Sequence, residues 1–275
     1  TPLLCRVFRD QVMHWDVIDL PYMHEESPNL PFFRTALGAF AGSGERDAPL
    51  LSHVLDLPGT WDELMSSFKS KQRVAHRTKW TRLMDGNAGR ALAGGRDLPL
   101  EAAFDELWRL HETRFEGRHS AFLNPEMKRL QQELIRRWGA RGRIVLPLLE
   151  ANGSIVAAHY GFALFGKHWS YQTGFDPACA NLSAGILSLG WTVRCAIEKG
   201  LREFDHMPGD ARYKQEWSTR VRRVCFLEAF NYLSLTSLTF RTVRALNRLG
   251  PPVETPPDPA PGDEQAERPA ALAVR

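Results

Sequence analysis

The three small residues Ser183-Ala184-Gly185 mark the point in the chain where an anionic ligand is easiest to hold. They open a helical pattern, because apolar residues recur at spacings of three and four from Ile186 to Ile197. The first amides of a helix have no intrahelical acceptor, and small side chains let a phosphate approach them. We therefore predict cofactor binding at Ser183, Ala184 and Gly185. The alternative is a serine that caps an ordinary helix with nothing bound.

A second group of polar residues lies just downstream. Asp205 is on a predicted strand near its end, where a carboxylate is well placed to act as a general base or to anchor an acceptor amine. The alternative is that Asp205 orders the loop at Met207 to Gly209 by accepting backbone N–H groups. Lys214 is a candidate contact for a phosphate or carboxylate, and its alternative is an exposed surface lysine.

Further polar side chains are predicted near the same opening. Gln172 and Asn181 have amide groups that could hydrogen-bond a substrate. His159 is a candidate for substrate binding or for a base, as is His168 on the neighbouring strand, because the ordinary pKa of histidine is near neutral. The alternative for both is a strand histidine without a chemical role. Trp217 is expected to pack.

These residues are distributed over an ordered series of strands and helices. Asn152-Gly153 is a strong hairpin signal between two strand patterns, and Gly200 is expected to end the helix that follows Ser183. The series predicts an α/β domain. Its members are strands at 143–150, 154–165, 167–174, 203–207 and 222–229, and helices at 184–199 and 211–218.

Several short motifs occur in order along the chain: Leu182-Ser183-Ala184-Gly185, Phe204-Asp205, Gly209-Asp210 and Tyr213-Lys214 with Trp217, after Trp61-Asp62-Glu63-Leu64 and Phe104 to His111. With this order of elements, the chain from Pro49 to Phe230 resembles the CelD-like (cellulose-biosynthesis) acetyltransferase family. That family belongs to the GNAT superfamily and is related to the FemAB-type aminoacyl transferases.

The resemblance implies an α/β GNAT-like fold, a mixed and mostly antiparallel sheet flanked by helices. It implies a tandem arrangement in which residues 1–100 form a partial or degenerate first half and residues 101–250 form the acyltransferase domain. It implies acyl-CoA, chiefly acetyl-CoA, as the donor. Because many GNAT enzymes place a tyrosine at the start of the corresponding helix, it also implies that Tyr213 is the general acid. The usual pyrophosphate loop, Gln/Arg-x-x-Gly-x-Gly/Ala, is shortened here to Ser183-Ala184-Gly185.

The predicted function is the transfer of an acyl group from acyl-CoA to an amine or a hydroxyl. The resemblance implies a small-molecule or lipid-linked sugar acceptor in exopolysaccharide or cell-envelope synthesis. Two alternatives stay open. One is a FemAB-like transferase that uses aminoacyl-tRNA, and the other is a non-catalytic scaffold of a polysaccharide synthesis complex.

Two basic segments bear on the partners. Residues Lys69 to Arg82 contain six cations and no acid, which fits an anionic donor, a lipid-linked sugar nucleotide or a tRNA, and equally fits a solvated helix face. Residues 232–249 combine spaced leucines with arginines. For this predicted helix, packing on the parent domain or on a partner such as a synthase complex is favoured over contact with an anionic membrane. No DNA partner is predicted.

The composition is typical of a globular chain of one or two domains, with 275 residues of which 43% are hydrophobic and 24% charged. The sequence has no long apolar run and no secretion-signal pattern at its start. Its four cysteines are widely spaced, so neither a metal site nor a disulfide framework is predicted, which favours a reducing cytoplasm. Residues 251–275 hold seven prolines and are predicted to be a disordered tail.

Overall fold

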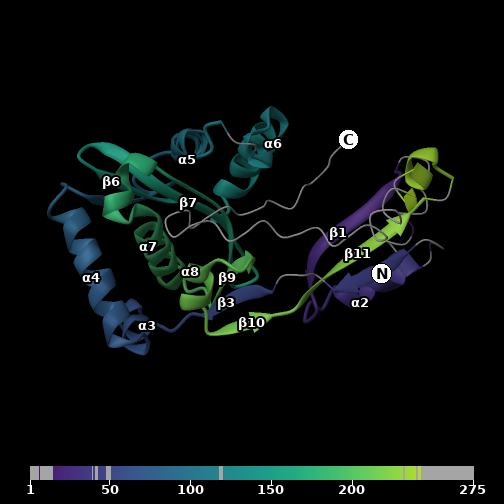
Figure 1. The fold of residues 1–275 in the computed structure, drawn as a ribbon, viewed down its shortest axis with the longest axis horizontal. Helices are drawn as coiled ribbons and strands as arrows, with labels where there is room; N and C mark the ends of the chain where they lie inside the picture. The colour runs from purple at the N-terminus through teal and green to yellow at the C-terminus, as the bar shows by residue number, and fades with distance from the viewer. Residues whose placement is uncertain are drawn as a thin grey trace. The chain divides into compact units, whose positions relative to one another are not determined.

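The computed structural model describes Arg6 and residues 15–38, 40, 43–47, 51–117, 120–231, 233–239 and 241–242. The predicted tail at 251–275 and most of the predicted helix at 232–249 lie outside the described residues. The chain forms two compact units (Figure 1). The first contains Thr1–Ser52, Pro208–Arg212 and Val221–Glu267, and the second contains His53–Met207, Tyr213–Arg220 and Arg268–Arg275.

The second unit is built on an eight-stranded sheet with the order β10-β3-β9-β8-β7-β6-β4, in which β5 also pairs with β7. The pairs β4–β6, β6–β7, β5–β7 and β7–β8 are antiparallel, and β8–β9 is parallel. The predicted mixed sheet is thereby confirmed. Its strands are β3 (Ser52–Asp56), β4 (Arg90–Ala93), β5 (Ile144–Val145), β6 (Pro147–Ala151), β7 (Ser154–Leu164), β8 (Lys167–Phe175), β9 (Glu203–Pro208) and β10 (Arg220–Arg222).

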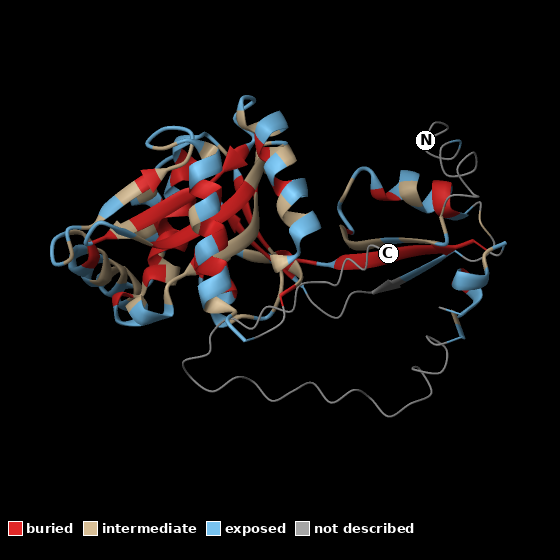
Figure 2. Cartoon of the chain, turned by 90° about the horizontal axis from the view of Figure 1, so that it is seen from above, coloured by how far each residue is buried: buried red, intermediate tan, exposed pale blue. Residues whose placement is uncertain are grey.

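Helices cover both faces of this sheet (Figures 1 and 2). On one face, Phe104 and Leu107 of α5 pack against Tyr160 of β7. On the other, Leu187 and Trp191 of α7 pack against the strands, with Leu83 of α4 beside them. The helices of this unit are α3 (Trp61–Ser67), α4 (Ser70–Met84), α5 (Leu100–Arg114), η2 (Ala121–Leu123), α6 (Pro125–Gly139), η3 (Pro177–Leu182), α7 (Ala184–Glu198) and α8 (Arg212–Glu216).

The local sequence signals explain most element boundaries. The turn at Asn152 and Gly153 joins β6 to β7, and Gly200, at φ 71°, follows α7 as predicted. The single strand predicted at 143–150 is two short strands, β5 and β6, separated at Leu146, whose C=O accepts from the N–H of Gly94. The sequence reasoning also missed η3.

The first unit contains a three-stranded sheet of order β1-β11-β2, antiparallel throughout. Leu30 and Leu37 of α2 pack against Leu227 and Ala229 of β11. Its elements are β1 (Val17–His24), α2 (Leu30–Gly38), β2 (Gly44–Asp47) and β11 (Val224–Phe230). The division into domains at residue 100, and the tandem origin of residues 1–100, stay predictions.

The basic helix α4 has two kinds of cation. Arg73 donates to the carbonyl oxygens of Ser66 and Phe68 at 3.2 and 2.8 Å, so it caps the end of α3. Lys71, Arg77 and Arg82 are exposed, and within the described part of the chain none of them forms an ion pair. Arg73 therefore has a structural task, and the other three leave positive charge on the surface.

The packing of α4 on α7 depends on Gly190. A Cβ atom at this position would lie 2.6 Å from Nε2 of His76 and 3.3 Å from the ring of Trp217. The imidazole of His76 cannot easily move aside, because the rings of Trp61, Trp80 and Trp217 lie 5.6, 6.2 and 5.9 Å from it.

We predict that Gly190→Ala lowers the free energy of unfolding. The overpacking costs about 1–3 kcal/mol, and the better helix propensity of alanine offsets about 1 kcal/mol. Urea denaturation of the two proteins measures the difference. Gly38→Ala is the matched control, because nothing lies within 4 Å of a Cβ atom on this α2 glycine. A Gly190→Ala protein as stable as the control would contradict the prediction.

Candidate active site

The sheet of the second unit opens between β8 and β9. These parallel strands pair at three positions only, Lys167–Glu203, His168–Phe204 and Trp169–Asp205, although both strands continue beyond them. A register shift against Tyr160 and Gly161 of β7 occurs at the same level of β8, and such bulges bend a strand. We call the opening bordered by 170–175 of β8 and 206–208 of β9 the β8–β9 fork. Along it, β8 stays paired with β7 on one edge and has no partner strand on the edge that faces β9.

The first turn of α7 lies at the wide end of this fork. Phe175 ends β8, and a Cβ atom on Gly185 would lie 3.4 Å from the Phe175 ring. Ala184 is buried, while Gly185 is half-buried. The helix therefore directs its first amides, which have no intrahelical acceptor, toward the place where β8 has left β9.

Ser183 does not cap α7 with its side chain, as the alternative to cofactor binding required. It precedes the helix at φ 55° and ψ 37°, and its hydroxyl makes no capping hydrogen bond. The capping part of that alternative is wrong, because an N-cap side chain reaches the helix amides from an extended backbone. Here η3 leads directly into α7, and the chain makes the turn in the left-handed region at Ser183.

The end of α5 brings a cation to the same place. Nη1 of Arg114 donates to the carbonyl oxygen of Thr173 at 3.2 Å, and its guanidinium lies 4.8 Å from the ring centroid of Phe175. Phe175 is thus in contact with Arg114 and adjacent to the first turn of α7. A guanidinium and a helix N-terminus both favour an anion. Sequence reasoning missed Arg114 because a tertiary contact links α5 to β8.

Asp205 is fully buried at the last paired position of β9. Its Oδ1 accepts the N–H of Met207 at 2.8 Å. Met207 has φ 62°, a left-handed conformation that costs a non-glycine residue about 1 kcal/mol. The carboxylate therefore shapes the end of β9, which matches the loop-ordering alternative. A catalytic role for Asp205 stays a prediction.

His206 and Tyr213 meet just beyond the last β8–β9 pair. Nε2 of His206 lies 3.1 Å from the carbonyl oxygen of Trp217, and because a carbonyl only accepts, Nε2 donates this hydrogen bond. Burial, together with the charge of Lys214, lowers the pKa of His206 to about 3, although the hydrogen bond to Trp217 acts in the opposite direction. The ring of Tyr213 meets that of His206 edge-on, 6.4 Å away. His206 was not among the predicted site residues.

Lys214 is buried in α8, with 2% of its surface exposed. The alternative of a plain surface lysine is therefore wrong. The chain buries it because α8 follows β9 directly and Trp217, one turn later, packs edge-on against Phe68 at 5.1 Å. The expectation that Trp217 packs is met, with 3% of its surface exposed.

Two histidines on β7 and β8 lie in the same interior. His159 is 3% exposed, and its ring nitrogens lie 2.8 Å from the Ser170 hydroxyl and 3.3 Å from the Thr173 hydroxyl. This satisfied environment fits the structural alternative for His159. His168 stacks on Phe204 at 4.3 Å, and neither of its ring nitrogens has a hydrogen-bond partner among the described residues.

The two predicted amide residues differ in their surroundings. Gln172 is half-buried on the part of β8 that borders the fork, and it pairs in register with Tyr160. Asn181 is exposed in η3, just before the first turn of α7. The structure therefore gathers Gln172, Asn181, Ser183–Gly185 and Tyr213 on the elements that border the fork. Their contacts with a ligand stay predictions.

Two further features are absent from the described residues. Nowhere among them do three or more His, Cys, Asp or Glu side chains come together as metal ligands would. None of the helices in the described ranges combines the length and the apolar composition that crossing a bilayer requires.

The class of this protein, a GNAT-type acyltransferase, is shown by a family match, and the mixed sheet with helices on both faces agrees with it. Residues 70–215, more than half of the chain, match the acetyltransferase (GNAT) domain family, and the chain belongs to this family. The narrower CelD-like assignment is taken up under the proposed function. Among the curated proteins no match was found.

Solved structures share the fold over most of the chain. FemX superposes with a TM-score of 0.59 and 10% identity, covering 86% of this chain and 78% of its own. L-PGS from Bacillus licheniformis gives 0.51 and 11%, covering 84% and 73%. A conserved protein of unknown function from Bacteroides thetaiotaomicron gives 0.53 and 11%, covering 83% and 75%. At these identities the likeness is one of fold alone.

The buried histidines make stability depend on pH. Burial, with the neighbouring charges of His159 and His206, holds the pKa of His168 well below its ordinary value of 6.5. The unfolded chain therefore binds protons before the folded protein does. Stability is complete above pH 6.5 and falls as the pH drops below it, by up to about 1.4 kcal/mol per pH unit for each such histidine.

We predict that His168→Phe flattens this dependence. The variant keeps an aromatic ring on Phe204 and removes two buried nitrogens without partners, so it should be at least as stable as the wild type at pH 7.5. Urea denaturation from pH 7.5 to 4.5 measures the slope. Phe204→Leu is the control, because it perturbs the same contact and keeps the titrating group. An unchanged slope in His168→Phe would contradict the prediction.

Proposed function

We propose that this protein transfers an acyl group, chiefly acetyl, from an acyl-CoA to an amine or a hydroxyl. The observation that carries the proposal is the β8–β9 fork with the first turn of α7 at its wide end. A strand edge without a partner strand can hydrogen-bond the extended, amide-containing arm of the donor. The first amides of a helix suit its pyrophosphate.

The donor-binding group in this proposal is Ser183, Ala184 and Gly185. The small side chains keep the α7 amides accessible, and the Ser183 hydroxyl, which does not cap the helix, is a further donor to a phosphate. Arg114, whose guanidinium lies over Phe175, supplies a positive charge that the shortened Ser183-Ala184-Gly185 loop lacks. No metal is part of the proposal.

The reaction forms a bond from the acceptor nitrogen or oxygen to the thioester carbonyl carbon and breaks the carbon–sulfur bond. The acceptor loses one proton, and the leaving thiolate gains one. We assign the proton donor to the thiolate as Tyr213 and the proton acceptor as Asp205. His206, with a pKa of about 3, is too weak a base for this step near neutral pH. Lys214 is assigned to a phosphate or carboxylate contact.

The acceptor is proposed from the resemblance to the CelD-like family. It is a small molecule or a lipid-linked sugar of exopolysaccharide or cell-envelope synthesis, reached from the cytoplasm. Gln172 and Asn181 would hydrogen-bond the acceptor from the elements that border the fork. His159 is proposed to support acceptor binding indirectly, because both of its ring nitrogens already lie within hydrogen-bonding distance of hydroxyl groups of β8.

A second candidate function is FemAB-like transfer from an aminoacyl-tRNA. One observation favours it. Lys71, Arg77 and Arg82 are exposed on α4 without an acidic partner in the described part of the chain, which suits a polyanion. A third candidate is a scaffold of a polysaccharide synthesis complex that has kept the fold and lost the chemistry.

The first test is isothermal titration of the protein with acetyl-CoA and with a longer acyl-CoA. We expect micromolar affinity, and we expect Gly185→Glu to weaken it by more than about tenfold, because the added carboxylate repels the pyrophosphate. Gly185→Ala controls for the added Cβ atom, whose nearest neighbour is the Phe175 ring at an ordinary contact distance of 3.4 Å. Lys199→Glu controls for added negative charge at the other end of α7.

The outcomes separate the candidates. Equal binding by Gly185→Glu and wild type would contradict the proposed donor site. Absence of binding to both donors, together with salt-sensitive tRNA binding that Lys71→Glu and Arg77→Glu remove, would favour the second candidate.

With an acceptor identified, we predict that Tyr213→Phe lowers kcat by about 10²–10⁴-fold, the usual contribution of a general acid, and leaves the affinity for the donor unchanged. Tyr160→Phe is the control, because this fully buried tyrosine of β7 packs in the apolar core below α5. An unchanged kcat in Tyr213→Phe would contradict the assignment of Tyr213 as the general acid.

A further inference from the structure

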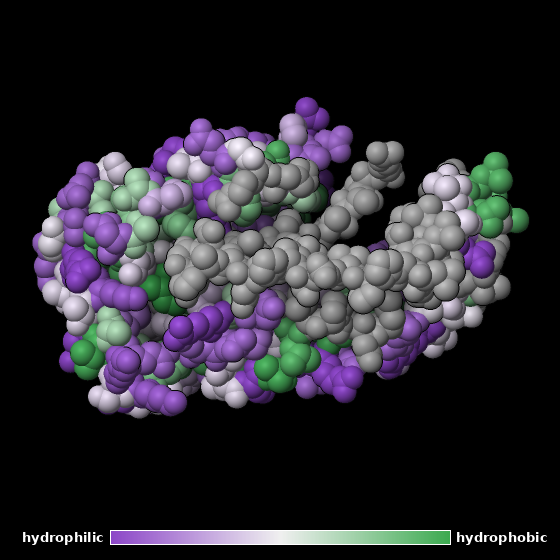
Figure 3. Space-filling model, viewed as in Figure 1, coloured by the Kyte–Doolittle hydropathy of each residue, from purple (hydrophilic) through white to green (hydrophobic). Residues whose placement is uncertain are grey.

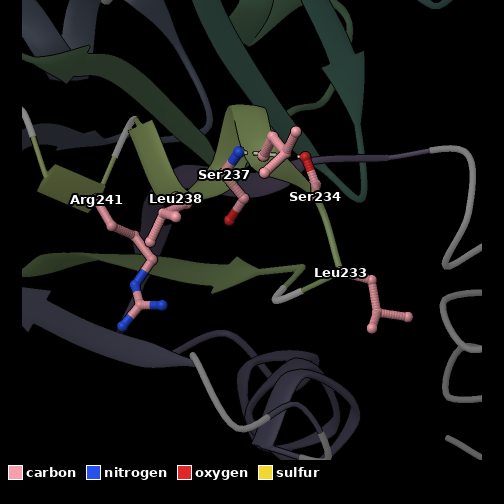
Figure 4. Close-up of a pocket in the computed structure, with 6 residues that line it drawn as sticks. Leu233, Ser234, Ser237, Leu238 and Arg241 are labelled. Carbon is pink, nitrogen blue, oxygen red and sulfur yellow. Dashed lines mark hydrogen bonds between the residues drawn. The ribbon is translucent and has the colours of Figure 1, made fainter.

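The narrow end of the β8–β9 fork is filled by side chains. Figure 3 shows hydrophilic residues over much of the visible surface of the second unit, whereas His168 and Phe204, the middle pair of the three that join β8 to β9, are fully buried. Described residues of the first unit, among them Leu233, Leu235 and Arg241, line a hollow that contains none of the fork residues (Figure 4). The room at the narrow end of the fork therefore depends on how its own side chains pack.

The proposed function places the reacting end of the donor at this narrow end. The pyrophosphate is assigned to the first turn of α7, at the wide end, and the arm of the donor to the unpaired edge of β8. From Phe175 back to Ser170 this edge measures about 20 Å of extended strand. An arm that follows the edge brings the thioester to the last β8–β9 pair, Trp169 with Asp205. The acyl group then points toward the paired part of the two strands.

An acyl chain at this position has to turn to one face of the sheet, because the strands beyond it are paired. Successive residues of a strand point to opposite faces. Trp169 and Asp205 therefore border one face, where the buried carboxyl group of Asp205 disfavours an alkyl chain. His168 and Phe204 border the other face. There Phe204 packs in an apolar cluster with Val193 of α7, so this is the face that suits an alkyl chain.

The side chains on that face are closely packed. The rings of Phe204 and His168 are stacked with their centroids 4.3 Å apart, and the ring of His159 lies 6.0 Å from His168 and 6.1 Å from Phe204. The ring of His206 lies 4.8 Å from Phe204. A Cβ atom on Gly161 would lie 2.6 Å from the ring of His168. Rings that are packed on several sides cannot move aside for added methylene groups without strain.

We propose that Phe204, held in place by its stack on His168, limits the length of the acyl group, so that the site takes acetyl and propionyl groups and excludes longer chains. This inference rests on the proposed function and adds the substrate range of the same site. An acetyl group carries one methyl group beyond its carbonyl carbon and needs the least space. Each further methylene group has to displace the Phe204 ring. Phe204 is thus a specificity-determining residue, and it takes no part in the proton transfers.

Isothermal titration of the full chain with acetyl-CoA, butyryl-CoA and hexanoyl-CoA tests the proposal. We expect the affinity of the wild type to fall at least about tenfold from acetyl-CoA to hexanoyl-CoA. Phe204→Ala opens a space that the longer chain can fill, so its affinity for hexanoyl-CoA should rise to within about threefold of that for acetyl-CoA. Circular dichroism checks that this variant is folded, and Phe204→Val replaces it if it is not.

Two variants are controls. Phe104→Ala removes the same ring from a fully buried position in the core below α5, and it should discriminate between the donors as the wild type does. Phe104→Val is its match if Phe204→Val is used. His168→Phe keeps an aromatic ring on Phe204, and it should also discriminate as the wild type does.

The outcomes separate this inference from the proposed function. Equal affinity of the wild type for acetyl-CoA and hexanoyl-CoA overturns the length limit and leaves the proposed function standing. The same conclusion follows if Phe204→Ala still discriminates as the wild type does, or if Phe104→Ala gains affinity for hexanoyl-CoA equally. Absence of binding to every acyl-CoA overturns the proposed donor site and the length limit with it.

Discussion

The early end of the β8–β9 ladder is the constraint on which the rest of the second unit depends. Two neighbouring strands in the middle of a sheet pair at three positions and then separate. Backbone groups left without a partner inside a protein cost free energy, so the surrounding structure has to compensate. The side chain of Arg114 does part of this by donating to the Thr173 carbonyl. Continuous pairing would cost less, which is why we interpret the separation as a ligand site.

The same region concentrates polar groups that the apolar core disfavours. His168, His206 and Lys214 are buried, and neither nitrogen of His168 has a hydrogen-bond partner among the described residues. Burying a polar group without a partner costs about 1–3 kcal/mol. The apolar packing of α5 on one face of the sheet and of α7 on the other offsets this cost. Buried polar groups that lower the stability of the fold are expected at functional sites.

The two units present different chemistry to their surroundings. The second has an opening lined by backbone groups and polar side chains, which suits the directional recognition of one small molecule. The first has a three-stranded sheet that packs against α2, and it exposes Leu233, Leu235 and Leu238.

Local signals in the sequence determined the succession of elements in the second unit. The Asn152-Gly153 turn, the spacing of apolar residues from Ile186 to Ile197 and Gly200 each act within a few residues, so they could be interpreted without a structure. The short helix η3 was missed, although Asp176 caps it and Pro177 opens it, a pattern typical of a helix start. Several residues of the candidate site, among them Ser183, Asp205 and Tyr213, could be named from the sequence because they lie in one short stretch of the chain.

Only the tertiary structure decided how these elements meet. The separation of β8 from β9, the approach of Arg114 to Phe175 and the burial of Lys214 depend on packing between segments far apart in the chain. The left-handed turn at Ser183, which removed its predicted capping role, arises because η3 runs directly into α7. Local sequence patterns report turn chemistry and periodicity, whereas strand separation and burial are set by long-range contacts that no short pattern contains.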